Sequence, residues 1–548
     1  MWRLTKLSLN FLISSFVFTF FILILILFLN ASITIQTGQI FSLYFELFVF
    51  YGPAWFLILT VIFTVIQFFS EKKYSIGIIS PPTVTYFLSF TILVISIIFY
   101  SNYEHYYDFF QPEIRFNFVK IILTNLILVI GGIIFVFFKK IDKKWIQIFF
   151  LALLSLNIIN SLSAIIYQPV KTTIKGADNH ISLSPNITPR KIRIVIMDGL
   201  SMKLIRTFSE DQKLLNFDFL FKNGVIGRIS AYRPNYNISL INSALTGLRP
   251  YKFKSHTDYK YRFSDLSPGF DIFPKYIFFR NSSVFKFTTI FRERKNSEYI
   301  DNLKAHYTLN NNKAVTLFTP YRLPTYSEKC LKKKSLYIKL FSNLIAPLGK
   351  KRNKINILNK SFYLDDYIKN YIPVLKDTDL FYSNFRLPGI GIVSRIFYQY
   401  SLPDIFGDIK ESDIKKYGRV LESYYEFYDT IIGTLISSTG EDELLVIMSF
   451  FEYEPLPVWR RILVNFFNRK DTERYVYSPF SKGTILMFSR NSIKKGYNLK
   501  SISISDIYPT LLYYSGFQLS KTLDGEVIKE IFSEDFILNN PIEIISGQ

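Results

Sequence analysis

The stretch KIRIVIMD, residues 191–198, decides the fold of the larger part of this chain. It is a short run of apolar and β-branched residues that ends abruptly in Asp198 and Gly199. Such a run is typical of a buried parallel strand that places one carboxylate at the carboxyl edge of its sheet. Ligands collect at this edge in open α/β sheets, so we take Asp198 as the reference point for a site.

The sequence after residue 190 alternates apolar runs with helical stretches. The clearest helix covers Asp413 to Ser437. This alternation predicts an α/β/α sandwich with a mainly parallel sheet. The middle, 250–385, is irregular and rich in lysine, notably at 329–339 and 350–360, and stays without a detailed assignment. The predicted strands are 192–197, 224–229, 389–393, 444–449 and 484–488.

The first part of the chain has the composition of a membrane domain. A bilayer is spanned by about 20 apolar residues, and no small-residue cleavage site follows the first apolar segment. We therefore predict a bundle of five transmembrane helices in residues 1–168, a polar linker at 169–190 and an extracytoplasmic domain at 191–548. The predicted spans are 9–34, 41–69, 83–100, 117–138 and 145–166.

Basic residues indicate which side of the membrane each end occupies. Arg3 and Lys6, the cluster at 71–73 and the cluster at 139–144 all fall on one face of the predicted bundle. Because cytoplasmic loops carry the excess of Lys and Arg, the N-terminus is predicted to be cytoplasmic and the large domain extracytoplasmic. The aromatic stretch 103–110 fits an outer interfacial belt, with a contact to lipid headgroups as the alternative.

Composition limits the classes of partner. The 548 residues carry a net charge of +22 and a single cysteine, Cys330, which excludes an intrachain disulfide and a multi-cysteine metal site. No nucleic-acid-binding motif accompanies the charge, so a nucleic-acid partner is not expected. An anionic lipid or an envelope polymer is the predicted partner besides the bilayer. The alternative is that the lysine content reflects only a general bias of the sequence.

Several motifs in this order resemble the alkaline-phosphatase superfamily, in particular its type I phosphodiesterase and nucleotide pyrophosphatase branch. The resemblance covers most of 190–535, and the five-span anchor resembles that of lipoteichoic acid synthases and phosphoethanolamine transferases. The motifs are IVIMDGLS (194–201), NGVIGRISAYRP (223–234), SALTGLRP (243–250), YYEFYDTIIGTLI (424–436), EPLPVWRR (454–461), GTILMFSRNSIKKG (483–496), ISDIYPTLLYYSGF (504–517) and LDGEVI (523–528).

Members of this superfamily typically hold two divalent ions, usually zinc, through three Asp and three His, and an alcohol or thiol between the metals is the nucleophile. The resemblance assigns the first ligand to Asp198. The nucleophile position falls on Asn237, whose amide is no such nucleophile, and Ser239 lies two residues out of register. The remaining ligand positions fall on Gly391, Arg395, Phe450, Phe451 and a place among Tyr477, Ser478 and Pro479.

Most of the implied ligands are therefore missing, and we expect no cofactor and no catalytic residue. Asp198 is interpreted as a vestigial ligand that caps the following helix, with cation binding as the alternative. Phe450 and Phe451 are interpreted as fillers of the vacated space, or else as the lining of an apolar pocket. Asp429 and Asp506 match the framework and are expected to be structural.

The histidines also give no support for a metal site. Of the four in the chain, His256 and His306 are interpreted as ordinary surface residues. A rearranged metal site built from Glu452, Glu454 and His256 with Asp198 is the alternative, and it would hold zinc or manganese.

The preferred hypothesis is a membrane-anchored, catalytically inactive relative of the phosphodiesterases with a binding, scaffolding or regulatory role in the cell envelope, beside other envelope proteins. The alternative is a divergent phosphodiesterase or phospho-group transferase that acts on lipid-linked or polymer substrates.

Overall fold

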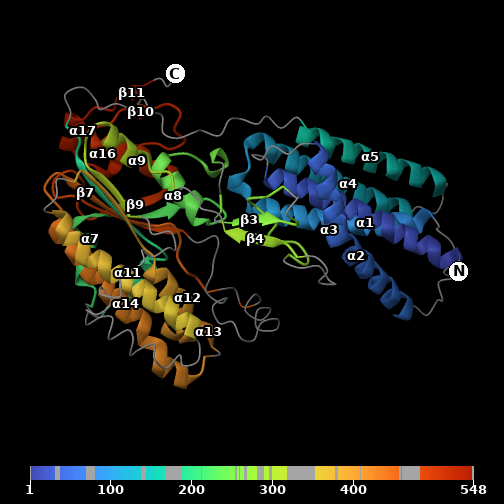
Figure 1. Cartoon of the computed structure of the whole chain (residues 1–548), viewed down its shortest axis with the longest axis horizontal. Helices are drawn as coiled ribbons and strands as arrows, with labels where there is room; N and C mark the ends of the chain where they lie inside the picture. The colour runs from blue at the N-terminus through green and yellow to red at the C-terminus, as the bar shows by residue number, and fades with distance from the viewer. Residues whose placement is uncertain are drawn as a thin grey trace. The chain divides into compact units, whose positions relative to one another are not determined.

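A computed structural model shows a mixed α/β chain with apolar helices at its N-terminus (Figure 1). The structure describes residues 2–30, 37–69, 81–137, 143–166, 188–210, 213–253, 256–257, 259–264, 268–280, 289–294, 299–317, 352–376, 380–407, 409–455, 458 and 482–545. The predicted linker, Cys330, the lysine cluster 329–339 and residues 477–479 lie wholly or almost wholly outside these ranges.

Contacts divide the chain into two compact units. The first combines residues 1–174 with 250–298, and the second combines 175–249 with 299–548. The sequence shows no sign that 250–298 associates with the apolar helices rather than with the sheet.

The first unit contains five long helices at the predicted places. Four of them are long and apolar enough to cross a membrane, and their candidate spans are Ser8–Leu29, Gly38–Val65, Phe87–His105 and Pro112–Gly132. The fifth contributes only the shorter apolar stretch Phe150–Leu162, so five spans are not confirmed. The helices are α1 (Trp2–Leu29), α2 (Thr37–Phe69), α3 (Pro81–His105), α4 (Pro112–Phe137) and α5 (Lys143–Ile166).

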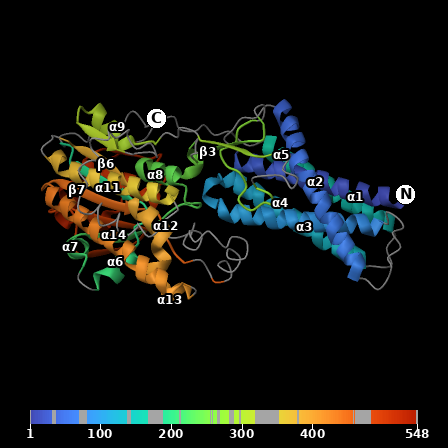
Figure 2. The same ribbon diagram turned by 60° about the horizontal axis from the view of Figure 1, so that its bottom comes forward.

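The same unit includes a small antiparallel hairpin, formed by β3 (Tyr259–Arg262) and β4 (Phe291–Arg294). Figures 1 and 2 both show β3 beside the apolar helices. Two short 3-10 helices, η1 (Tyr107–Phe109) and η2 (Pro250–Lys252), also pack against each other in this unit.

The second unit is built on a sheet of seven of the described strands, in the order β5-β6-β1-β7-β8-β2-β9. Only β8 runs antiparallel to its neighbours in this sheet, which confirms the mainly parallel arrangement. The strands are β1 (Lys191–Met197), β2 (Val225–Ser230), β5 (Ala314–Leu317), β6 (Tyr382–Leu387), β7 (Glu443–Ser449), β8 (Gly483–Phe488) and β9 (Tyr497–Ser503).

Helices cover both faces of this sheet (Figure 1). One layer contains α7 (Leu215–Asn223), α11 (Arg352–Lys376), α12 (Gly389–Ser401) and α14 (Glu411–Ser438), with α6 (Met202–Ser209) packed against α14. The other contains α8 (Asn237–Thr246), α9 (Asn302–Leu309), α16 (Ile507–Ser515) and α17 (Glu534–Asn539). The remaining elements are α13 (Pro403–Phe406), η6 (Ile504–Asp506), η7 (Lys529–Ile531), β10 (Leu519–Ser520) and β11 (Ile544–Ile545).

The predicted strand at 389–393 is wrong. Those residues form the first turns of α12, and the strand is β6, which ends at Leu387 just before Pro388. The apolar pattern is misleading because β6 buries the polar residues Ser383, Asn384 and Arg386. The two residues assigned to ligand positions, Gly391 and Arg395, therefore lie on a helix and not at the end of a strand.

Candidate functional site

The edge of the sheet at the carboxyl ends of β6, β1 and β7 is the candidate site. In register, β1 pairs Ile196 with Arg386 on one side and with Met448 on the other. The residues that follow β1 and β7 therefore come together beside Arg386, as expected for neighbouring parallel strands.

Asp198 forms a buried ion pair with Arg386. Arg386 donates to the carboxylate through Nη2 at 2.7 Å and through Nε at 3.1 Å, and the residues are only 4% and 8% exposed for Arg386 and Asp198. The guanidinium also donates from Nη1 to the hydroxyl of Tyr299 at 3.0 Å. A guanidinium thus already compensates the negative charge of the first predicted metal ligand.

The predicted capping role of Asp198 is wrong. The N-cap of α6 is Ser201, whose hydroxyl accepts from the backbone N–H of Leu204 at 3.4 Å. The carboxylate that reaches this helix end is Glu452, which follows β7 and is 5% exposed.

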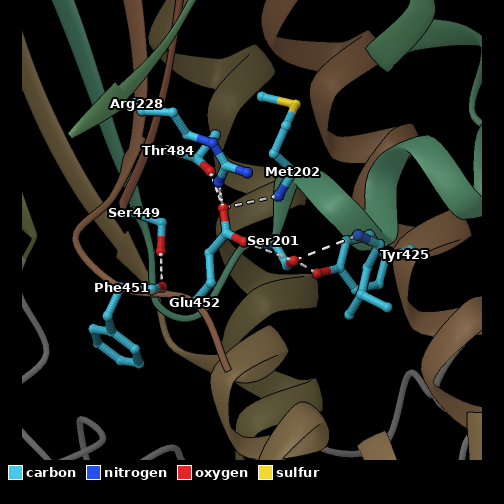
Figure 3. Close-up of polar contacts among 9 residues, drawn as sticks. Ser201, Met202, Arg228, Tyr425, Ser449, Phe451, Glu452 and Thr484 are labelled. Carbon is cyan, nitrogen blue, oxygen red and sulfur yellow. Dashed lines mark hydrogen bonds and ion pairs between the residues drawn. The ribbon is translucent and has the colours of Figure 1, made fainter. Parts of the chain in front are cut away.

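Glu452 contacts residues of three other elements (Figure 3). Its Oε1 accepts from the N–H of Met202 at 3.1 Å and from the hydroxyl of Thr484 at 2.8 Å, and it pairs with the guanidinium of Arg228. Its Oε2 accepts from the hydroxyl of Ser201 at 3.0 Å. Because an anion at a helix N-terminus is stabilised by the free amides there, Glu452 is satisfied as a structural carboxylate that connects α6, β2 and β8.

Two tyrosines of α14 line the neighbouring space. The hydroxyls of Tyr424 and Tyr428 donate to Oδ2 of Asp365 on α11 at 2.5 and 2.8 Å. Burial, with a smaller contribution from the charge of Asp198, raises the pKa of Asp365 to about 7, although both hydrogen bonds act to lower it. A third tyrosine, Tyr425, accepts from the N–H of Ser201 at 3.0 Å.

Phe450 and Phe451 lie where the resemblance placed an Asp-His pair. They are 1% and 8% exposed and belong to the hydrophobic core of the unit. The carbonyl of Phe451 also accepts from the hydroxyl of Ser449 at 2.9 Å (Figure 3). This burial supports the interpretation that the two rings fill the space.

Gly391 leaves no room for a ligand side chain. A Cβ atom there would lie 2.8 Å from the carbonyl oxygen of Asp198, a backbone atom that cannot move freely. Arg395, one turn later, is exposed on α12. The start of α12 is therefore packed directly against the backbone that carries Asp198.

The predicted nucleophile position is the first residue of a helix. Asn237 begins α8, the helix that follows β2. Ser239 is fully buried in the same helix.

Two further carboxylates stabilise helix ends. Asp429 accepts from the N–H groups of Asn216 and Phe217 at 3.0 and 2.9 Å and so caps α7. Asp506 forms a capping box with Ser503. Both residues have the structural role that we predicted.

The residues of the possible rearranged site are not gathered in one compact unit. Glu454 is exposed beyond Glu452, whereas His256 belongs to the unit of the apolar helices, where its ring contacts Phe109. His306 in the second unit has its Nε2 2.8 Å from the hydroxyl of Tyr508. Both histidines are buried, so their prediction as surface residues is wrong.

The donor set around Asp198 does not fit the two-metal centre that the resemblance implies. Within the described residues, no three His, Cys, Asp or Glu side chains come together in a way that could hold a metal ion. Asp198 is paired with a guanidinium and packed against a glycine without space for a side chain, and the nearby carboxyl of Asp365 accepts from two tyrosine hydroxyls. Guanidinium and tyrosine hydroxyl groups are not usual ligands of zinc in such a centre.

Arg386 and Asp365 are the site residues that sequence reasoning missed. Both come from the middle region that the motifs do not cover. An arginine inside a short strand is a signal that it has a buried acidic partner, but the partner cannot be identified without the strand order.

Comparisons with known proteins add little to this geometry. No family model matches the sequence, and no curated protein matches it either. Among solved structures, the chain is similar to a phosphonate monoester hydrolase from Silicibacter pomeroyi, at 12% identity and a TM-score of 0.32, over 62% of this chain and 76% of that one.

Proposed function

We propose that this protein is a membrane-anchored, non-catalytic member of an otherwise enzymatic fold, with a binding, scaffolding or regulatory role in the cell envelope. The observation that carries the proposal is the buried ion pair between Asp198 and Arg386, with Nη2 and Oδ2 2.7 Å apart. The large unit would lie outside the cytoplasm, as the basic loops predict.

The chemical argument concerns the charge of the site. A divalent ion at Asp198 would have to displace the guanidinium and leave Arg386 buried without its anion, and breaking a buried pair costs about 3 to 5 kcal/mol. A lone carboxylate does not offset such a cost, because tight zinc sites use three or four protein ligands. Among the described residues of this edge, no set of side chains is suited to hold the metal ions that stabilise a phosphoryl transition state in two-metal enzymes.

The proposed partners follow from charge and location. A net charge of +22 favours anionic lipids or an anionic envelope polymer through long-range attraction. Other envelope proteins are the remaining proposed partners, and cross-linking in native membranes followed by mass spectrometry would identify them.

Metal content and hydrolysis test the proposal. The full chain, purified in detergent without chelators, is expected to carry far less than one zinc or manganese ion, and Asp198→Asn is expected to leave its background activity on a chromogenic phosphodiester unchanged. The matched control is Asp404→Asn, which alters an exposed carboxylate.

The result that overturns the proposal is equally definite. About two divalent ions per chain, with hydrolysis that Asp198→Asn abolishes while the variant stays folded in thermal unfolding and Asp404→Asn preserves, would establish the alternative of a divergent phosphodiesterase or phosphotransferase.

A further inference from the structure

We propose that Phe278 and Phe279 insert into the lipid bilayer beside the apolar helices and form an aromatic contact of the segment 268–280 with acyl chains. The inference rests on the proposed membrane anchoring and adds to it a second, non-helical contact with lipid. It concerns only the first compact unit, to which both the helices and this segment belong.

The segment is held on the helices by Asn30, just after α1. The side chain of Asn30 donates to the carbonyl of Ile272 at 2.7 Å and accepts from the N–H groups of Asp271 and Ile272 at 3.0 and 2.9 Å. One side-chain amide therefore forms hydrogen bonds with both N–H and C=O groups of the segment's backbone, as the backbone of a neighbouring strand would.

A second asparagine repeats this arrangement on α3. Asn102 donates to the carbonyl of Tyr276 at 2.9 Å and accepts from the N–H of Lys275 at 2.8 Å. Tyr106 adds a bond from its hydroxyl to the carbonyl of Phe273 at 3.1 Å. Because Asn30 and Asn102 are nearly completely buried, the backbone of 271–276 is fixed against the helix ends.

Phe278 then reaches an aromatic side chain inside a candidate span. Its ring centroid lies 6.5 Å from that of Trp55, which is in the span Gly38–Val65. Trp55 also stacks on Phe18 and Phe90, from the spans of α1 and α3. Phe278 therefore lies along the spans and not beyond their ends.

The two phenylalanines are nevertheless only partly covered by protein. Phe278 and Phe279 are 47% and 40% exposed. Phe90, whose ring also contacts Trp55, is 37% exposed. The exposed apolar surface of the segment is thus continuous with that of a span, whose solvent is lipid.

The flanking charges fit the same position. Lys275 and Arg280 lie on either side of the two phenylalanines in sequence. Both are only partly exposed, and aromatic rings with neighbouring Lys and Arg are typical of the membrane interface.

Site-directed fluorescence in lipid vesicles tests the inference. In a Cys330→Ser background, Phe279→Cys is labelled with an NBD fluorophore, and the full chain is reconstituted in phosphatidylcholine and phosphatidylglycerol vesicles that contain doxyl-labelled lipid. We expect quenching by the doxyl lipid that is about twofold or more above that of Leu309→Cys, an exposed position of the second unit.

A third variant separates this inference from the membrane anchoring itself. Ile127→Cys lies in the candidate span Pro112–Gly132 and is 60% exposed. Quenching at Ile127→Cys but only the level of Leu309→Cys at Phe279→Cys would overturn the lipid contact and leave the anchor intact. Absence of quenching at both Ile127→Cys and Phe279→Cys would overturn the anchor and the inference together.

Discussion

At the scale of single residues, the central contact is the guanidinium of Arg386, which is the counter-charge of the Asp198 carboxylate. Arg386 contributes a fixed positive charge that needs no cofactor, with 4% of its surface exposed. The negative charge at the end of the central strand is therefore compensated by a side chain of the protein itself.

Removal of this guanidinium should destabilise the second unit. Arg386→Met leaves the Asp198 carboxylate buried without its ion-pair partner, and we expect a loss of about 3 to 5 kcal/mol, measured by thermal unfolding in detergent. Adding Asp198→Asn should recover most of the loss, because the double variant no longer buries a lone charge. A double variant as unstable as Arg386→Met would show that the pair is not the cause.

Asp365 should make the stability of the same unit depend on pH. Its pKa of about 7 in the folded chain lies above the value of 3.8 for an unperturbed carboxyl, so the folded state holds this proton more tightly. The stability that the neutral carboxyl provides is complete below pH 3.8 and is lost as the pH rises toward and through 7.

Asp365→Asn should therefore be more stable than the original chain at pH 8, by about 2 kcal/mol, and the difference should shrink at pH 5. The amide oxygen can still accept from Tyr424 and Tyr428. Unfolding curves at the two pH values measure the effect, and Asp404→Asn, at an exposed position, should show no such pH dependence. Equal differences at pH 5 and pH 8 would contradict the assignment.

At the scale of elements, the start of α12 is the part of the site with the least space for larger side chains. Gly391 is packed on the backbone of Asp198, and Gly389 is packed on Asp365 and Tyr424. Two glycines thus allow the start of α12 to pack closely against Asp198, Asp365 and Tyr424.

Gly391→Ala tests this close packing. Its Cβ would lie 2.8 Å from the Asp198 carbonyl oxygen, so we expect a destabilisation of about 1 to 3 kcal/mol in the unfolding of the second unit. The control is Gly440→Ala, whose Cβ would meet no atom closer than 3.7 Å. Equal stability of the two variants would mean that α12 can shift away from β1.

Elements with a simple apolar pattern could be predicted from the sequence. The strands β1, β2, β7 and β8, the helix α14 and the positions of the five N-terminal helices were all accessible in this way. β6 was not, because its buried Ser383, Asn384 and Arg386 have the pattern of an exposed segment.

The candidate site could be predicted only in part, for a related reason. Asp198 and Glu452 follow strands that the apolar pattern predicts. The partners Arg386 and Asp365 depend on long-range pairing, which local sequence does not encode.

At the scale of the whole molecule, the side of the membrane that each end occupies is still a prediction. In a Cys330→Ser background, Leu309→Cys should react with a membrane-impermeant maleimide in intact cells, and Trp145→Cys at the start of α5 should react only after permeabilisation. Both positions are more than 60% exposed, at 63% and 67%. The opposite pattern would place the large unit in the cytoplasm.

The hydrogen bonds of Asn30 and Asn102 also affect the order in which this protein folds during translation and the fragments into which it can be cut. The helices precede residue 175, but the residues that Asn30 and Asn102 bind come after Arg249, once the first part of the other unit has been made. The membrane unit is therefore completed late in translation. A soluble fragment that begins after the linker would carry Phe270, Ile272 and Phe273, all at most 1% exposed in the full chain, without the helices of their own compact unit, and it should aggregate.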